Sequence, residues 1–311
     1  MKVLAVTNHY PSEESPGDTP CIRDQILTLR RLGIEVDVVP IDRARRRSSY
    51  FQVALRLFLT SFRRKRYDLI HAYYGYPGLL ALLQFKVPVV VTFRGSDLLS
   101  RRNRHLGPWI AKQVEGVIVM SEEMRRVSGR EDARIIPFGV DLGPCSPYPM
   151  ERARIDLGLP LGDKLVLFPW NPGRPEKRFD IASAAVEQLQ AERRNLRLVP
   201  VWDEPPETVF KYMNACDALV LVSDREGAPM AVREALACNL PVVSVDVGDV
   251  RQVINDLEGC YLCRQDADDV AEKLRLALDR ERRLEGSRAR VLDVKQASEA
   301  VIEVYNSVLD H

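Results

Sequence analysis

The sequence predicts an α/β protein of two domains, each with a parallel sheet covered by helices on both faces. Three observations support this prediction. Short apolar runs alternate with amphipathic stretches along most of the chain, as they do in successive βα units. The length of 311 residues fits about two domains of ordinary size. A stretch rich in Pro and Gly with no clear strand, residues 141–163, separates two such alternating regions.

The first domain is expected to span residues 1–145. Its strands are short apolar runs, at 3–7, 36–40, 69–71, 89–93, 117–120 and 134–136. Its helices have apolar residues three and four positions apart, at 22–32, 50–62, 77–85 and 109–114. In open α/β sheets ligands bind at the carboxyl ends of the strands, so the loops that follow these strands are candidate binding loops.

The second domain is expected to span residues 146–296 and to repeat the same alternation. Its expected strands are 165–168, 196–201, 218–222, 241–245 and 260–262. Its expected helices are 179–189, 208–215, the one that contains Glu234, and those that follow residue 268. Asp266 and Asp268 form an Asp-x-Asp pattern that could hold a metal, but a helix begins there, so we interpret the pattern as a helix cap.

Composition and charge exclude some classes of protein. A hydrophobic content of 46% and a net charge of +1 are typical of a globular chain rather than a disordered one. Residues 1–145 hold 23 Lys and Arg against 15 Asp and Glu, whereas the remainder holds 22 against 29. The first domain therefore attracts anions. No nucleic-acid motif accompanies the basic residues, so we expect no nucleic acid as a partner.

The basic residues gather in the segment 43–66, where nine Arg and Lys are interleaved with aromatic and aliphatic residues. Such segments bind anionic membrane surfaces, although an ordinary helix with a basic solvated face has the same pattern. The six cysteines are scattered, and no secretory signal or apolar run of ~20 residues is present. We therefore expect a cytoplasmic protein with reduced thiols, in peripheral contact with the inner face of the membrane. Cys260 and Cys263 lack the further ligands of a zinc site.

Residues 226–243 are the most informative stretch. Glu226 lies in a Gly/Pro loop, and Glu234 lies eight positions later inside the following helix. The start of a helix favours a phosphate, and a carboxylate two turns further along can accept hydrogen bonds from sugar hydroxyls. The stretch therefore indicates a site for a nucleotide sugar. The competing interpretation is a helix with two solvated glutamates.

Residues 171–178 form a second candidate binding loop, between a strand and a helix. Lys177 lies there with Arg174 and Arg178 on either side. Two or three cations beside a helix start suit a diphosphate, whose charge a helix dipole alone does not neutralise. The alternative is a solvated basic turn.

These stretches, together with four others in the same order, resemble retaining GT-B glycosyltransferases of family 4. The others are 3–11, 69–74, 91–98 and the expected hinge 136–141. The resemblance implies two Rossmann-like, doubly wound domains facing a cleft. It also implies that a last helix, about 297–311, packs back on the first domain. No Gly-x-Gly-x-x-Gly follows the first strand, which argues against a dinucleotide oxidoreductase.

The resemblance implies a retaining transferase of the hexosyltransferase type. It would move a sugar from a nucleotide-diphosphate sugar to a glycan or lipid-linked acceptor, in cell-surface polysaccharide or glycolipid synthesis. The implied catalytic residues are Glu226, Lys177, Arg94 and Asp97. The implied donor-binding residues are Gly17, Arg174, Arg178, Gly227, Ala228, Pro229, Met230 and Glu234. The acceptor-side candidates are His71, Asp18 and Thr19. We expect no cofactor and no metal.

The chain departs from the family pattern at several of these positions. Arg94 stands where the family more often has a histidine; it either holds an anionic group or pairs with Asp97. Pro172 stands where the family usually has an arginine that binds the diphosphate together with the lysine, here Lys177. Arg174 or Arg178 is therefore expected to take the role of that arginine. Gly17 stands alone where a glycine pair is usual. The departures leave two alternatives: a GT-B nucleotide-sugar epimerase, or a non-catalytic protein that binds nucleotide sugars or membranes.

Overall fold

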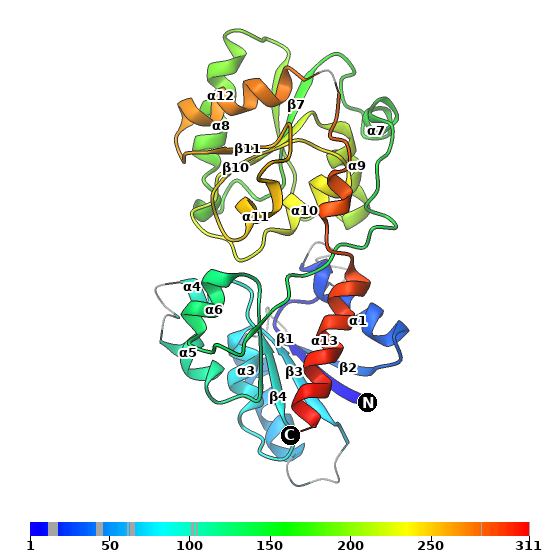
Figure 1. The fold of residues 1–311 in the computed structure, drawn as a ribbon, viewed down its shortest axis with the longest axis vertical. Helices are drawn as coiled ribbons and strands as arrows, with labels where there is room; N and C mark the ends of the chain where they lie inside the picture. Colours follow the sequence, from blue (N-terminus) through cyan, green and yellow to red (C-terminus); the bar gives the residue numbers. More distant parts are fainter. Residues whose placement is uncertain are drawn as a thin grey trace. The chain divides into compact units, whose positions relative to one another are not determined.

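The computed structural model describes residues 1–11, 18–41, 46–60, 62, 66–100, 103, 105–280 and 282–310; for residues 46, 47 and 60 only the backbone is described. The chain forms two compact units (Figure 1). Of the described residues, the first unit contains 1–11, Asp18–Gly139 and the segment from Val294 onward, and the second contains Val140–Asp293. Each unit is a parallel sheet with helices on both faces, which confirms the predicted α/β class.

The sheet of the first unit has six strands, all parallel, in the order β2-β1-β3-β4-β5-β6. The strands are β1 (Lys2–Thr7), β2 (Glu35–Pro40), β3 (Leu69–Tyr73), β4 (Val89–Thr92), β5 (Gly116–Val119) and β6 (Arg134–Ile135). Every residue of β3, β4 and β5 is buried. Strands of this kind are continuous apolar runs because helices cover both faces of the sheet.

The helices of the first unit are α1 (Pro20–Arg31), α2 (Arg46–Thr60), α3 (Gly75–Ala81), α4 (Ser96–Leu99), α5 (Leu106–Ala111), α6 (Glu122–Ser128) and α13 (Val294–Leu309). The last helix, α13, packs against α1 and β5 (Figure 1). Helices α4 and α6, four and seven residues long, were not predicted. The residues that cap α6 are nevertheless of the types that usually cap helices: Ser121 precedes its start, and Gly129, at φ 69°, follows its end.

The segment 43–66 is described only in part. Helix α2 covers its centre, whereas Arg43, Arg45, Arg63, Arg64 and Lys65 lie outside the described residues. The structure gives the backbone of Arg46 and Arg47 without their side chains, and it describes Arg56 and Arg66.

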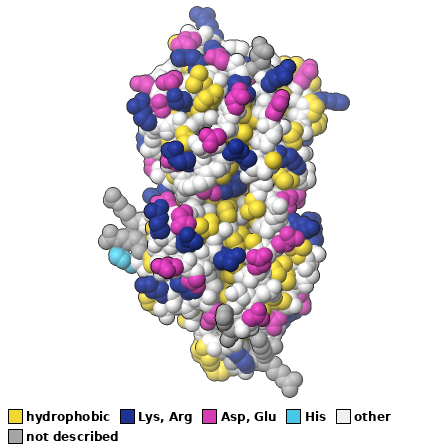
Figure 2. All heavy atoms as spheres, in the orientation of Figure 1, with side chains coloured by type: hydrophobic (Ala, Val, Ile, Leu, Met, Phe, Trp, Pro, Cys, Tyr) yellow, Lys and Arg dark blue, Asp and Glu magenta, His cyan; other side chains and the backbone are white. Residues whose placement is uncertain are grey.

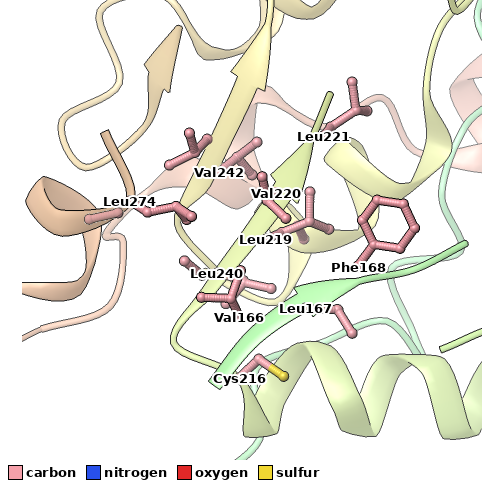
Figure 3. Close-up of a cluster of buried hydrophobic side chains, with 14 of the residues drawn as sticks. Val166, Leu167, Phe168, Cys216, Leu219, Val220, Leu221, Leu240, Val242 and Leu274 are labelled. Atoms are coloured by element: carbon pink, nitrogen blue, oxygen red, sulfur yellow. The ribbon is translucent and has the colours of Figure 1, made fainter. Parts of the chain in front are cut away.

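The sheet of the second unit has five parallel strands in the order β11-β10-β9-β7-β8. The strands are β7 (Lys164–Phe168), β8 (Leu196–Pro200), β9 (Ala218–Leu221), β10 (Val242–Val245) and β11 (Tyr261–Cys263). Figure 3 shows the core: successive residues of β7 and β9 are buried and contribute to it together with Leu274 of a covering helix. Because the two central strands are buried on both faces, the loops at their carboxyl ends start from fixed points.

The helices of the second unit are α7 (Met150–Asp156), α8 (Phe179–Gln190), α9 (Pro206–Ala215), α10 (Met230–Ala237), α11 (Val250–Ile254) and α12 (Ala267–Leu278). Helices α8 and α12 pack together, as do α9 and α10 (Figure 1). The Asp266 carboxylate accepts a hydrogen bond from the Asp269 backbone N–H at 3.0 Å at the start of α12. The predicted helix cap is therefore confirmed.

Lys and Arg side chains are interspersed with Asp and Glu over the face drawn in Figure 2, with hydrophobic side chains exposed among them. None of the helices in the described ranges has the length and apolarity needed to cross a bilayer.

Candidate functional site

The first element of the site is an ion pair between the loops that follow β7 and β9, two paired strands at the centre of the second sheet. Lys177 ends a single 3-10 turn, Pro175–Lys177, and its Nζ lies 2.5 Å from Oε1 of Glu226. The Lys177 ammonium also lies 4.9 Å from the centre of the Trp170 ring. Lys177 is only 6% exposed, so its charge is buried. A carboxylate and an aromatic face stabilise this buried charge.

The two loops are also tied by their backbones. The Asp224 backbone N–H donates to the carbonyl of Glu176 at 2.9 Å. Residues 49 positions apart in the chain, Lys177 and Glu226, are thus held together by the sheet and by this backbone hydrogen bond. The structure brings together the cation and the carboxylate that the sequence assigned to one donor site.

Helix α10 follows the Glu226 loop and contains Glu234, whose side chain is half-buried. The loop residues Gly227 and Pro229 are buried, while Ala228 and Met230 are half-buried. The residue before α10, Pro229, makes no side-chain capping hydrogen bond to the first backbone N–H groups of the helix. The start of α10 carries only a partial positive charge, so it suits an anionic ligand only together with the full charge of Lys177.

Arg174 and Arg178 differ from Lys177, because both are engaged by carboxylates within two residues of themselves. Arg174 is paired with Glu176 at 2.6 Å and is largely exposed. Arg178 is paired with Asp180 at 2.9 Å and lies 3.6 Å from Asp224. The Arg178 backbone has φ 53°, in the left-handed region that residues other than glycine seldom adopt.

A buried ion pair beside this site was not predicted from the sequence. Arg233 of α10 makes a two-pronged ion pair with Asp249, and both side chains are nearly inaccessible. The neighbouring Gly248 has φ 61°, and a Cβ at that position would lie 2.5 Å from the carbonyl oxygen of Gly227. The loop after β10 therefore packs directly on the backbone of the Glu226–Gly227 loop. No sequence period links residues 233 and 249, so only the fold reveals the pair.

In the first unit, Arg94 and Asp97 follow β4. The Asp97 carboxylate accepts from the backbone N–H groups of Arg94, Gly95 and Gly75 at 2.9 to 3.1 Å. Burial raises the pKa of Asp97 above its ordinary value, and these backbone donors oppose the shift. Asp97 thus fixes the loop backbone and makes no hydrogen bond to the Arg94 side chain, which disfavours the alternative in which Arg94 pairs with Asp97.

The Arg94 guanidinium instead lies between two aromatic rings, 5.0 Å from Tyr74 and 4.8 Å from Phe138. It donates to the Tyr74 hydroxyl at 2.8 Å and to the Cys21 sulfur at 3.3 Å. Tyr74 has φ 85°, a backbone conformation that costs a non-glycine residue roughly 1–3 kcal/mol. Strain of that kind leaves no trace in the sequence, and sequence reasoning did not find Tyr74.

Asp18 and Thr19 meet a residue that the sequence did not single out, His9. The Nδ1 atom of His9 lies 2.8 Å from the Asp18 carboxylate, and the Thr19 hydroxyl donates to the same carboxylate at 3.2 Å. The His9 ring lies 5.0 Å from the Tyr74 ring, so this group is contiguous with Arg94. Gly17, also predicted for the donor site, lies outside the described residues.

His71 does not belong to a binding surface. Strand β3 extends to Tyr73, so His71 lies in its middle and is fully buried. Its ring nitrogens lie 2.6 Å from the Tyr305 hydroxyl and 2.7 Å from the Thr92 hydroxyl. Burial lowers the pKa of His71 to about 3, which keeps the ring neutral. The predicted acceptor-side role of His71 is therefore wrong; the residue joins α13 to the sheet.

The thiols are all free and buried or half-buried, and Cys260 and Cys263 lie at β11. Within the part of the chain that the structure describes, no group of three or more His, Cys, Asp or Glu side chains is arranged to hold a metal ion.

Comparison with known proteins identifies the family of the chain. The family model "Glycosyltransferase Family 4" matches residues 3–143, and "Glycosyl transferases group 1" matches residues 200–291. The putative teichuronic acid biosynthesis glycosyltransferase TuaC of Bacillus subtilis is 26% identical, with 88% of each chain covered.

Solved structures support the fold. Sucrose-phosphate synthase from Thermosynechococcus elongatus has a TM-score of 0.78 at 18% identity, with 100% of each chain covered. Anabaena HepE in complex with UDP and glucose has a TM-score of 0.74 at 16% identity, with 99% of this chain and 100% of that one covered. Two parallel-sheet units of this kind define the GT-B class of fold. The chain belongs to the group 1, family 4 glycosyltransferases.

Proposed function

We propose that the protein transfers a sugar from a nucleotide-diphosphate sugar to a glycan or lipid-linked acceptor, with retention of anomeric configuration. The observation that carries the donor half of this proposal is the Lys177–Glu226 pair. It places a buried cation and a carboxylate side by side, 2.5 Å apart, at the carboxyl ends of β7 and β9. Such a pair suits a ligand that presents both a diphosphate and hydroxyl groups.

Each donor-site residue has a proposed role. Lys177 binds the diphosphate, with Arg174 or Arg178 added once either leaves its neighbouring carboxylate. Glu226 and the backbone of Gly227, Ala228, Pro229 and Met230 hold the transferred sugar. Glu234 accepts hydrogen bonds from ribose hydroxyls, four residues along helix α10 from Met230. Gly17 is proposed to lie close to the diphosphate.

The proposed reaction has no covalent enzyme intermediate. The acceptor oxygen forms a bond to the anomeric carbon on the face from which the diphosphate leaves, while the bond from that carbon to the phosphate oxygen breaks. The acceptor proton passes to an oxygen of the leaving diphosphate. Lys177 stabilises the charge that develops on the diphosphate, so catalysis depends on positioning and electrostatics. No metal or cofactor is proposed.

The first unit is proposed to bind the acceptor. Arg94 and Asp97 are the proposed catalytic residues there, with Asp18 and Thr19 beside them. Tyr74 orients Arg94, and Asp97 fixes the loop. The names of relatives support the classes of substrate: TuaC is described as a biosynthetic glycosyltransferase of teichuronic acid, and HepE was solved with UDP and glucose. We propose that the protein acts in cell-surface polysaccharide or glycolipid synthesis, on the cytoplasmic side of an anionic membrane.

The test combines ligand binding with turnover. A panel of nucleotide-diphosphate sugars is screened by thermal unfolding, because a ligand at 100 times its Kd stabilises the folded state by about 2.7 kcal/mol. The stabilising donor is then incubated with and without acceptors, and released nucleoside diphosphate and the anomeric form of the product are measured. Transfer with retention supports the proposal. Conversion of the sugar nucleotide without acceptor would identify an epimerase, and binding without turnover would identify a non-catalytic protein.

A further inference from the structure

Helix α2 has two apolar faces, whereas a helix on the surface of a soluble unit normally has one. Val53 and Leu57 are buried against the first unit. A second set of large apolar side chains, spaced four, three, one and three positions apart, is exposed. It consists of Phe51 at 70% exposure, Leu55 at 47%, Phe58 at 43%, Leu59 at 41% and Phe62 at 66%. The spacing of Phe51, Leu55, Phe58 and Leu59 places these four side chains along one side of the helix, and Phe62 follows just beyond its end at Thr60.

The exposed set continues onto the segment that follows α3. The Phe58 and Phe62 rings have centroids 5.2 Å apart, and the Phe62 and Phe85 rings have centroids 6.1 Å apart, both in edge-on arrangements. Phe85 is 75% exposed. We call these six residues, Phe51, Leu55, Phe58, Leu59, Phe62 and Phe85, the α2 stripe. Contiguous exposed apolar patches of this kind mark interaction surfaces.

The charge around the α2 stripe identifies its partner. The segment 43–66 contains nine Arg and Lys and no Asp or Glu. Lys86 directly follows Phe85 in the sequence, and Arg56 lies within α2. Arg66 is 3.8 Å from Asp37, so its charge is partly compensated. The sequence surrounding the stripe is therefore strongly basic, which favours an anionic partner.

A second copy of the chain fits the stripe poorly. In a two-fold dimer the same patch meets itself, so the basic segments of both copies would face each other. An anionic lipid surface satisfies both properties, because apolar rings enter the boundary of the acyl chains while Arg and Lys keep their charges among the headgroups.

We propose that the α2 stripe inserts into the surface of an anionic bilayer and holds the first unit there. The six stripe residues would then be the ones through which the enzyme contacts the membrane. The biological role of this contact rests on the proposed transferase function, whereas the contact itself does not. Binding to a bilayer is measured without any donor or acceptor, so failure of the transfer reaction and failure of docking are separate results.

The experiment uses co-sedimentation of the full chain with vesicles of phosphatidylcholine alone or mixed with phosphatidylglycerol. The stripe variant is F51S/F62S, and the matched control is I155S/L161S, which alters two similarly exposed apolar residues of the second unit. The wild type and the control are expected to bind the anionic vesicles, and the stripe variant to bind them about tenfold or more weakly. Wild-type binding is expected to weaken between 0.1 and 1 M salt, where the Debye length falls from about 10 to about 3 Å.

Three results would overturn the proposal: equal binding by the stripe variant and the wild type, equal binding to neutral and anionic vesicles, or no vesicle binding at low salt. Sedimentation velocity without vesicles tests the second-copy alternative. A wild-type dimer that F51S/F62S converts to a monomer, with no vesicle binding by either, would assign the stripe to self-association. Thermal unfolding of both variants confirms that they are folded, which is expected because all four altered side chains are exposed.

Discussion

Single residues of the second unit hold charges that the fold has already partly neutralised. Lys177 is buried against Glu226 and Trp170, while Arg174 and Arg178 are paired with carboxylates at the surface. A buried cation with one carboxylate partner can be shared with an incoming diphosphate, because the local dielectric is low and the attraction strong. The Lys177 side chain is therefore expected to contribute more to diphosphate binding than either arginine.

Replacing Lys177 with Ala is expected to weaken binding of a nucleoside diphosphate about tenfold or more, since a hydrogen bond to a charged group is worth roughly 1.5–3 kcal/mol. Binding of the nucleoside alone is expected to change little. Calorimetric titration of both ligands measures the difference, and Lys211→Ala, which alters an exposed lysine paired with Asp156, is the control. Equal losses for the diphosphate and the nucleoside would remove Lys177 from the phosphate site.

Replacing Glu234 with Ala is expected to weaken binding of the nucleoside itself by about tenfold or more, because the carboxylate is proposed to accept hydrogen bonds from the ribose. The fold is expected to survive, since Glu234 is only half-buried. Titration with nucleoside and with nucleotide sugar tests this, with Glu207→Ala on the exposed face of α9 as the matched control. An unchanged affinity in the folded variant would exclude Glu234 from the site.

His71 links pH to stability, because its pKa is lowered to about 3 in the folded protein from 6.5. The unfolded chain binds the proton first as the pH falls, so the stabilisation is complete above about pH 6.5 and is lost progressively down to about pH 3. Between pH 7.5 and 5 the loss is about 2 kcal/mol. Urea unfolding of the wild type and His71→Gln at both pH values measures it. Identical pH dependences for the two proteins would mean that His71 is not the titrating group.

At the level of elements, the donor loop is shaped by its neighbours. The Glu226–Gly227 loop runs from the end of β9 to the start of α10, and the loop after β10 packs on it through Gly248. Helix α10 is fastened to that second loop by the Arg233–Asp249 pair. These contacts pre-organise the Glu226–Gly227 backbone, which lowers the cost of ordering the loop when a donor binds.

Breaking the Arg233–Asp249 pair on one side is expected to be worse than replacing both residues. Arg233→Met leaves the Asp249 carboxylate unpaired in a nearly inaccessible place, which costs about 3–5 kcal/mol. The double variant R233M/D249L removes both charges and is expected to recover much of this loss. Urea unfolding of the two variants and the wild type gives the comparison. If the double variant is as unstable as Arg233→Met, the pair acts by packing and not by charge.

At the scale of the whole molecule, the positive charge proposed to act on the donor comes from side chains. Transfer is therefore expected to continue in EDTA at a rate close to that in Mg²⁺, since Lys177 and a neighbouring arginine take the place of a divalent ion. The measurement is the initial rate of nucleoside diphosphate release in EDTA, with and without excess Mg²⁺. Activity that disappears in EDTA and returns with Mg²⁺ would show that a metal takes part.

Most of the fold could be predicted from the sequence. Apolar runs and helical periods located the strands and the longer helices, because burial on both faces of a sheet forces continuous apolar stretches. Prediction of short helices was uneven, because one or two turns give only a weak period: α3 and α5 were found, whereas α4 and α6 were missed. Resemblance to a family placed Lys177, Glu226 and Glu234 in one site, and the structure holds the first two of these in contact.

The sequence by itself determined the α/β class, the cap at Asp266 and the residue types that suit a nucleotide sugar, because these depend on local pattern and chemistry. The tertiary structure alone decided that His71 is buried, that Asp97 binds backbone N–H groups rather than the Arg94 side chain, and that Arg233 meets Asp249. It also decided which face of α2 remains exposed. Those outcomes depend on contacts between residues far apart in the chain, which packing of the sheets and helices creates and no local pattern encodes.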